Sequence, residues 1–110
     1  MICVVYDRKR NDLTIDGHAC SGESGHDLVC ASASILVYTL ASAVRNMAAA
    51  EHVTAPTLEL AEGHGHIYCK PKERFRSAVM LIFDTVCSGF ELLAANYPDN
   101  IKYEIKEMRT

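Results

Sequence analysis

The chain has 110 residues, of which 49% are hydrophobic and 23% charged, and its formal net charge is −3. This length predicts a single domain over residues 1–110, because two separate cores would be too small to be stable. The composition excludes disorder, collagen and coiled coil. The acidic balance argues against direct nucleic-acid binding, which needs a basic excess to neutralise phosphates.

The first two predicted elements are strands that pair as a hairpin. Ile2–Tyr6 alternates apolar side chains on one face, and Arg8–Asp12 is expected to be a solvated, charged turn. Leu13–His18 is the second expected strand, with its polar side chains on the other face. This pattern places Asp16 and His18 together, away from the apolar face.

A loop and a long helix are expected next. The loop, Ala19–His26, contains Gly22 and Gly25 and is predicted to be easily reshaped. Asp27 is expected to be the N-cap of a helix over Leu28 to about Ala50. Because this helix is apolar or small on nearly every face, we expect one face on a sheet and another on a partner subunit, as in a homodimer.

The second half predicts a further hairpin, a helix and a strand. Thr57–Ala61 and His66–Lys70 are the expected strands, joined by a turn over Glu62–Gly65. Pro71 fits the first turn of the second helix. A helical stripe then steps along Phe75, Val79, Ile82, Val86, Phe90 and Leu93.

The last expected strand, Ile101–Lys106, alternates apolar and charged residues. The complete order is ββαββαβ, which predicts a two-layer α+β fold. In such a fold a mostly antiparallel sheet carries both helices on one face.

The sequence also indicates a compartment. No export signal is recognised, since Asp7 ends the short apolar run at the start, and the uncharged stretch Leu28–Val44 is at the short limit for a membrane span. The cysteine count of five is odd, which favours reduced thiols in the cytoplasm. Cys3, Cys69 and Cys87 lie on apolar patterns and are expected in the core.

Cys30 and His18 are the candidate catalytic residues. With Asp27 as N-cap, Cys30 would be the third helical residue, where the partial positive charge of the helix end favours a thiolate. The loop can return His18 to the thiol, and a cysteine with a histidine is the minimum for nucleophilic catalysis. Free N–H groups at the helix start would serve as oxyanion donors. Asp27 and Asp16 are candidates for orienting His18. Alternatively, Cys30 could be a small core residue without a catalytic role.

The same segment allows other chemistry. His18, Cys20, His26 and Cys30 are residue types that bind zinc, but their spacing is irregular. Cys20 and Cys30 could also form a disulfide that acts as a redox switch. The HxH of His64 and His66 is expected to be a hairpin turn with exposed imidazoles. We therefore predict no metal and no cofactor.

Two short blocks carry a resemblance to a known family. Gly17-His18-Ala19 and Asp27-Leu28-Val29-Cys30-Ala31, separated by a glycine-containing loop, resemble the ribosomal-processing cysteine protease (Prp) family, and the resemblance extends over most of the chain. It implies that His18 and Cys30 form the catalytic dyad and that Asp27 occupies the family's acidic position. Ser34 matches the family's helix pattern, which implies packing. Cys20 and His26 depart from the commonest pattern.

The resemblance also implies a substrate. Members of this family remove a short N-terminal extension from a large-subunit ribosomal protein, after paired aromatic residues, and form homodimers with a mobile loop between the two catalytic residues. We expect the loop to close over an extended peptide, with Gly22 and Gly25 as its flexible points. The alternatives are a ribosome-associated interaction module without turnover and a small zinc-binding protein.

Overall fold

The computed structural model describes residues 1–17 and 24–107, and for residues 24–27 it describes the backbone alone. Its elements follow the order ββαββαβ predicted from the sequence. They are β1 (Ile2–Asp7), β2 (Asp12–Asp16), α1 (Ser24–Ala49), β3 (Val53–Ala61), β4 (His64–Pro71), the short 3-10 helix η1 (Glu73–Phe75), α2 (Arg76–Asn96) and β5 (Ile101–Lys106).

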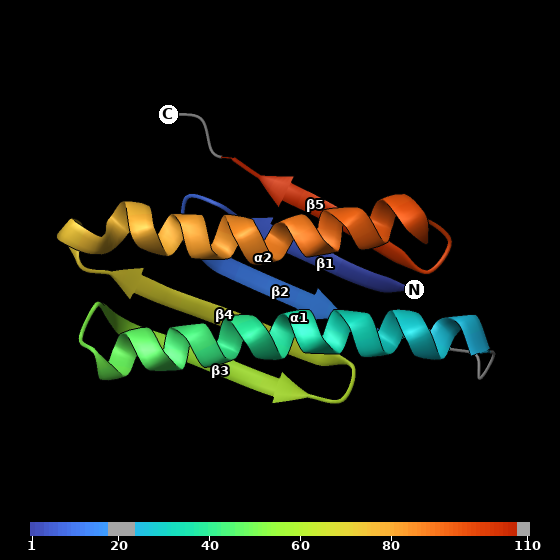
Figure 1. Cartoon of the computed structure of the whole chain (residues 1–110), viewed down its shortest axis with the longest axis horizontal. Coiled ribbons are helices and arrows are strands. Elements are labelled where there is room, and N and C mark those ends of the chain that lie inside the picture. Colours follow the sequence, from blue (N-terminus) through green and yellow to red (C-terminus); the bar gives the residue numbers. More distant parts are fainter. Residues whose placement is uncertain (18–23, 108–110) are drawn as a thin grey trace.

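The strands form one mixed sheet in the order β3-β4-β2-β1-β5. β1 pairs with β2, β2 with β4, and β4 with β3 in antiparallel fashion, whereas β1 and β5 are parallel. The mostly antiparallel sheet predicted from the sequence is thus confirmed. β5 is parallel to β1 because the chain returns along α2 before it re-enters the sheet (Figure 1).

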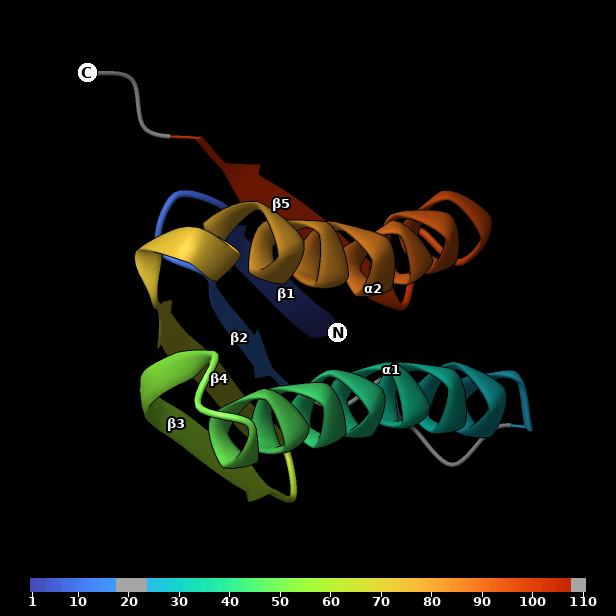
Figure 2. The same ribbon diagram turned by 60° about the vertical axis from the view of Figure 1, so that its left-hand side comes forward.

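Both helices lie on the same face of the sheet and run in opposite directions (Figures 1 and 2). The strands alternate accordingly: Ile2, Val4 and Tyr6 point toward the helices and are buried, as predicted. No layer of the described chain covers the other face, which we call the open face of the sheet. It carries Cys3, which is exposed, so the prediction that Cys3 belongs to the core is wrong.

The core lies between the sheet and the two helices. Leu40 and Val44 from α1 meet the sheet, and the buried residues of α2 are Val79, Phe83, Cys87 and Phe90. Val79 and Phe90 belong to the predicted stripe, and its members Ile82, Val86 and Leu93 pack partly buried beside them. Cys69 and Cys87 are buried, as predicted, and burial raises the pKa of their thiols to about 11 and about 12.

Several element boundaries differ from the prediction. α1 begins at Ser24, so Asp27 is its fourth residue and not its N-cap, and Gly25 lies in the helix and not in a loop. Similarly, β2 ends at Asp16, before His18. Local capping signals are ambiguous here, because a serine and an aspartate three residues apart can each begin a helix.

The second hairpin is longer than predicted. β3 begins at Val53, four residues before the expected start at Thr57, and its irregularity between Thr54 and Thr57 accommodates Pro56. The turn is Glu62–Gly63 alone, because His64 already pairs with Asp16 in the sheet. Pro71 ends β4 and does not begin a helix; η1 separates it from α2.

The charged turn after β1 was expected to be solvated, but its residue Arg8 also contacts α2. The guanidinium of Arg8 donates to both carboxylate oxygens of Asp84 on α2, from Nε to Oδ1 at 3.0 Å and to Oδ2 at 3.3 Å, and from Nη2 to Oδ2 at 3.0 Å. The hydroxyl of Tyr6 donates to the same carboxylate at 2.8 Å. The hydrogen bonds from Arg8 are the main reason that the pKa of Asp84 lies below its ordinary value. This network ties α2 to the end of β1.

Both helices are long and apolar enough to cross a membrane by length and composition. In the fold, each helix packs one side on the sheet. Only a minority of either helix is buried, and the exposed apolar side chains are Leu28, Ile35, Tyr38, Leu81 and Leu92.

Candidate active site

Four segments distant in sequence meet at one end of the sheet. The start of β1, the end of β2 and the β3–β4 turn lie beside the N-terminal half of α1 (Figure 1). The antiparallel pairing brings the end of β2 and the start of β4 together, since Asp16 is opposite His64. The sheet thus builds a platform below this part of the helix.

A cavity of about 520 Å³ opens between this platform and α1. Its walls are mostly apolar side chains and backbone of small residues. The lining residues are Ile2, Ile15, Gly17, Cys30, Ala33, Ser34, Val37, Tyr38, Leu60, Ala61, Glu62, Gly63, His64 and Gly65.

Cys30 borders this cavity from α1 and is half-buried. Of the four cysteines that the structure describes, it alone lines the cavity, since Cys69 and Cys87 are in the core and Cys3 is on the open face. It is the seventh residue of α1, not the third. The helix dipole acts mainly within the first turn, so the predicted thiolate stabilisation by the helix end is not supported. The free N–H groups of the helix likewise belong to residues that precede Cys30.

Gly17 forms the floor of the cavity where β2 ends. Its φ is +100°, a conformation that favours glycine, and a Cβ at this position would overlap the carbonyl oxygen of Met1. Its N–H donates to the carbonyl oxygen of Gly63 in the β3–β4 turn at 2.9 Å. Only glycine therefore fits this close approach of three backbone segments.

Behind the cavity, on the open face, His64 contacts two carboxylates. Its Nδ1 lies 2.6 Å from Oδ1 of Asp16 and its Nε2 lies 3.7 Å from Oε1 of Glu59. The hydrogen bond to Asp16 is the main cause of a pKa of His64 above its ordinary value. His64 belongs to β4 and not to the turn, which corrects the prediction, but it is exposed as predicted. His66 lies in the strand as predicted, but its imidazole is partly buried.

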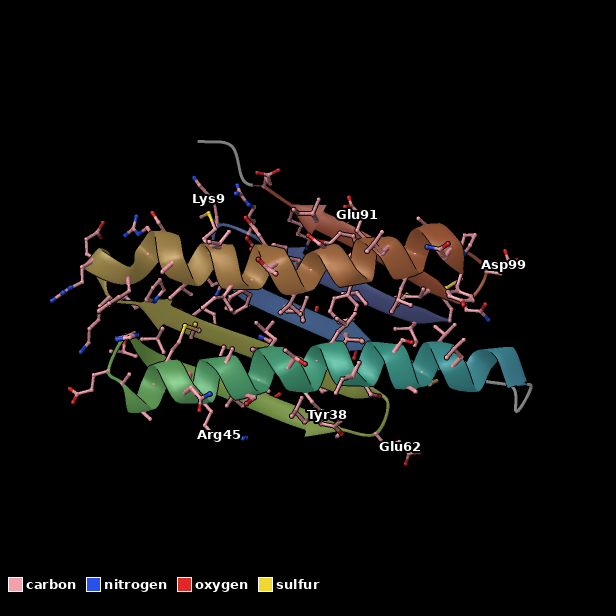
Figure 3. The ribbon with its side chains drawn as sticks, in the orientation of Figure 1. Lys9, Tyr38, Arg45, Glu62, Glu91 and Asp99 are labelled. Carbon is pink, nitrogen blue, oxygen red and sulfur yellow. The ribbon has the colours of Figure 1, made fainter. Side chains whose placement is uncertain are left out.

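The outer wall of the cavity was missed by sequence reasoning. Ser34 and Tyr38 follow Cys30 at intervals of four, so helical periodicity places all three on one face. Ser34 is exposed and does not pack in the core, contrary to the expected packing role. Figure 3 shows Tyr38 on the flank of α1 near the end of β3, with Glu62 in the turn beyond it.

Several predicted site residues lie outside what the structure describes. These are His18, Cys20 and Gly22, together with the side chains of His26 and Asp27. The predicted dyad geometry, the four-residue zinc site and the disulfide between Cys20 and Cys30 are therefore not tested. Within residues 1–17 and 24–107, no group of three or more histidine, cysteine or acidic side chains is arranged to hold a metal ion.

A cysteine at the edge of an apolar cavity, on a two-layer α+β fold, is an arrangement suited to a cysteine peptidase. Comparison with known proteins agrees. The family model described as cysteine protease Prp matches residues 1–102, and the chain therefore belongs to the Prp cysteine protease family and is a peptide hydrolase. The resemblance inferred from the two sequence blocks is confirmed.

Relatives described as ribosomal processing cysteine proteases include proteins of two bacterial species. The ribosomal processing cysteine protease Prp of Staphylococcus aureus is 28% identical over 98 residues, which is 89% of each chain. The Bacillus subtilis protein of the same name is 28% identical over 101 residues, covering 88% of this chain and 87% of the relative.

Solved structures show the same fold. The S. aureus ribosomal processing protease Prp, in complex with a substrate peptide, superposes with a TM-score of 0.71 at 27% identity, covering 96% of this chain and all of that one. A Streptococcus mutans protein superposes with a TM-score of 0.69 at 25% identity, covering 97% and 93%.

Proposed function

We propose that this chain is a cytoplasmic endopeptidase that removes the short N-terminal extension of a large-subunit ribosomal protein, with Cys30 as nucleophile and His18 as general base and acid. The observation that carries the proposal is Cys30 at the edge of the cavity between α1 and the β3–β4 turn. The names of the relatives, ribosomal processing proteases, support the substrate.

The chemistry follows from the two side chains. The Cys30 sulfur attacks the scissile carbonyl carbon while His18 takes the thiol proton, and His18 then gives that proton to the leaving amine as the C–N bond breaks. Water, deprotonated by His18, next cleaves the thioester and restores the thiol. His18 follows Gly17 directly in the sequence, and Gly17 borders the cavity.

The cavity suits an aromatic side chain next to the cleaved bond. Val37 and Tyr38 on α1 face Ile15 and Leu60 from the sheet, and all four side chains are at least partly apolar. Aromatic side chains gain more from burial among apolar walls than small ones do. Cleavage after paired aromatic residues is therefore the specificity that we propose.

The test uses two cysteine variants and a peptide that spans the extension. Cys30→Ala should abolish cleavage, whereas Cys3→Ala, which removes a thiol from the open face, should keep the wild-type rate. His18→Ala should lower kcat by about 10²–10⁴-fold. Cleavage by the Cys30→Ala variant at the wild-type rate would refute the assignment.

A second peptide tests specificity. Both aromatic residues before the scissile bond are changed to alanine, and kcat/KM is compared with that of the parent peptide. Equal values would remove the aromatic specificity from the proposal but leave the nucleophile in place.

A homodimer is also part of the proposal. The helix layer leaves Ile35 on α1 and Leu92 on α2 exposed beside a shallow hollow between the helices. Exposed apolar surface of this kind is typical of subunit contacts. Light scattering at micromolar concentration should give twice the monomer mass of 12.1 kDa.

A further inference from the structure

We propose that His64 is a positioning residue for this active site: from the open face of the sheet it holds Asp16 and so fixes Gly17 and the β3–β4 turn, the two backbone segments that border the cavity opposite Cys30. The inference rests on the proposed peptidase function, and it adds to the dyad a residue that does not touch the substrate.

Three contacts join the end of β2 to the start of β4. Asp16 and His64 are direct neighbours across the two strands, and Nδ1 of His64 lies 2.6 Å from Oδ1 of Asp16. One residue further, the N–H of Gly17 donates to the carbonyl oxygen of Gly63 at 2.9 Å. The side-chain contact is thus adjacent to the backbone bond that sets the floor of the cavity.

This junction has little room for adjustment. Gly17 has a φ of +100° and leaves no space for even a methyl group beside the carbonyl of Met1. β2 ends at Asp16, so the contact between His64 and Asp16 is a side-chain link at the very end of this strand, next to Gly17.

His64 borders the cavity, but its ring is on the open face of the sheet. Gly65 faces inward, since a Cβ there would lie 2.8 Å from Cγ2 of Ile15, and side chains alternate along a strand. His64 therefore acts through the backbone, not on the substrate. This location distinguishes it from a catalytic base.

The charged groups around His64 make the contact sensitive to pH. Asp16 faces it from β2 and Glu59 from β3, while His66 is its neighbour on β4 and Cys3 lies beyond Asp16 on β1. Two carboxylates favour the protonated imidazole, in keeping with its raised pKa. The ionic part of the contact is complete below the ordinary histidine pKa and is lost as the pH rises through the raised value.

The chain provides a matched control. Nε2 of His66 lies 2.9 Å from Oδ1 of Asp12, so the same kind of pair joins the same two strands. This second pair is at the other end of β2, away from Gly17. Removing it should cost a similar amount of sheet stability without moving the floor of the cavity.

The experiment measures kcat and KM for peptide cleavage by wild type, His64→Ala, His66→Ala and His64→Gln. His64→Ala should lower kcat about tenfold or more with little change in KM, because displaced catalytic geometry slows the reacting step. His66→Ala should stay within about twofold of wild type. His64→Gln, whose amide donates to Asp16 without a charge, should restore part of the activity.

The pH profile gives a second readout. The ratio of the wild-type kcat to that of His64→Ala should be largest near about pH 6. It should fall as the pH rises through the pKa of His64, because wild type then loses the imidazolium charge that the variant lacks at every pH. The ratio between wild type and His64→Gln should show the same fall. A pH-independent ratio, or equal losses of kcat in the two alanine variants, would overturn the proposal.

Hydrogen exchange of the Gly17 amide separates this proposal from the proposed function. Exchange should be faster in His64→Ala than in wild type and unchanged in His66→Ala, whether or not the peptide is cleaved. If wild type fails to cleave the peptide, the proposed function fails and the exchange result still decides the positioning role. If the Gly17 amide exchanges in His64→Ala at the wild-type rate, the positioning role is refuted.

Discussion

Gly17→Ala is the most direct test of the close backbone approach below the cavity. Alanine at a φ of +100° carries strain of about 1–3 kcal/mol. Its Cβ would also overlap the carbonyl oxygen of Met1, and relieving that overlap by shifting the start of β1 costs about 1–3 kcal/mol more. The free energy of unfolding should therefore fall by roughly 2–6 kcal/mol.

Thermal denaturation followed by circular dichroism measures this loss. For a domain of this size a loss of about 3 kcal/mol corresponds to a fall in Tm of about 12 °C. Peptide cleavage, measured at a temperature where the variant is still folded, should also fall because Gly17 borders the cavity.

Gly89→Ala is the matched control for the added methyl group. Its Cβ would lie 2.7 Å from Cδ2 of Leu36, the mobile end of a side chain beside the hollow between the helices. Alanine also gains about 1 kcal/mol over glycine within a helix, which offsets the cost of moving Leu36. If Gly17→Ala is as stable as Gly89→Ala, within about 0.5 kcal/mol, the reasoning about the backbone junction is wrong.

Three further results are expected. Asp84→Asn should lower the free energy of unfolding by about 1–2 kcal/mol at neutral pH; because the Asp84 pKa is lowered in the fold, this difference from wild type should persist in urea titrations down to about pH 4 and be lost as the pH falls further, through the lowered pKa. Iodoacetamide should modify Cys30 in the folded protein well before Cys69 or Cys87, whose buried thiols have raised pKa values, and mass spectrometry of peptides would show the order; equal rates would mean that the core opens freely. Phe83→Ala should lower the free energy of unfolding by about 3–5 kcal/mol, because the ring is fully buried, and a smaller loss in denaturant titration would mean that the core repacks around the cavity.

Much of the fold follows from local pattern. The alternation of Ile2, Val4 and Tyr6 and the helical stripe through Val79 and Phe90 each give the element type and its buried face, because strand and helix periods are short and repeat within a few residues. The two blocks around Gly17 and Cys30 indicated the family, and that identification is confirmed.

Element ends were less predictable. Ser24 and Asp27 are both good cap residues, and a cap is decided by fractions of a kcal/mol that the packing of the whole helix easily exceeds. Because α1 begins earlier than predicted, Cys30 lies in its second turn and not in its first. The argument that the helix end stabilises a thiolate at Cys30 therefore loses its support.

The sequence alone determined which residues alternate and which thiol and imidazole are candidates for chemistry. Tertiary structure decided which distant residues meet: Arg8 with Asp84, and Asp16 with His64. The first pair depends on how α2 packs beside β1. The second depends on the strand order β3-β4-β2-β1-β5, which no local period encodes, because strand pairing is a choice among segments far apart in the chain. Even Cys3, which alternation places opposite Ile2 and Val4, is exposed because the described chain covers only one face of the sheet, and that depends on the helix layer and not on the strand.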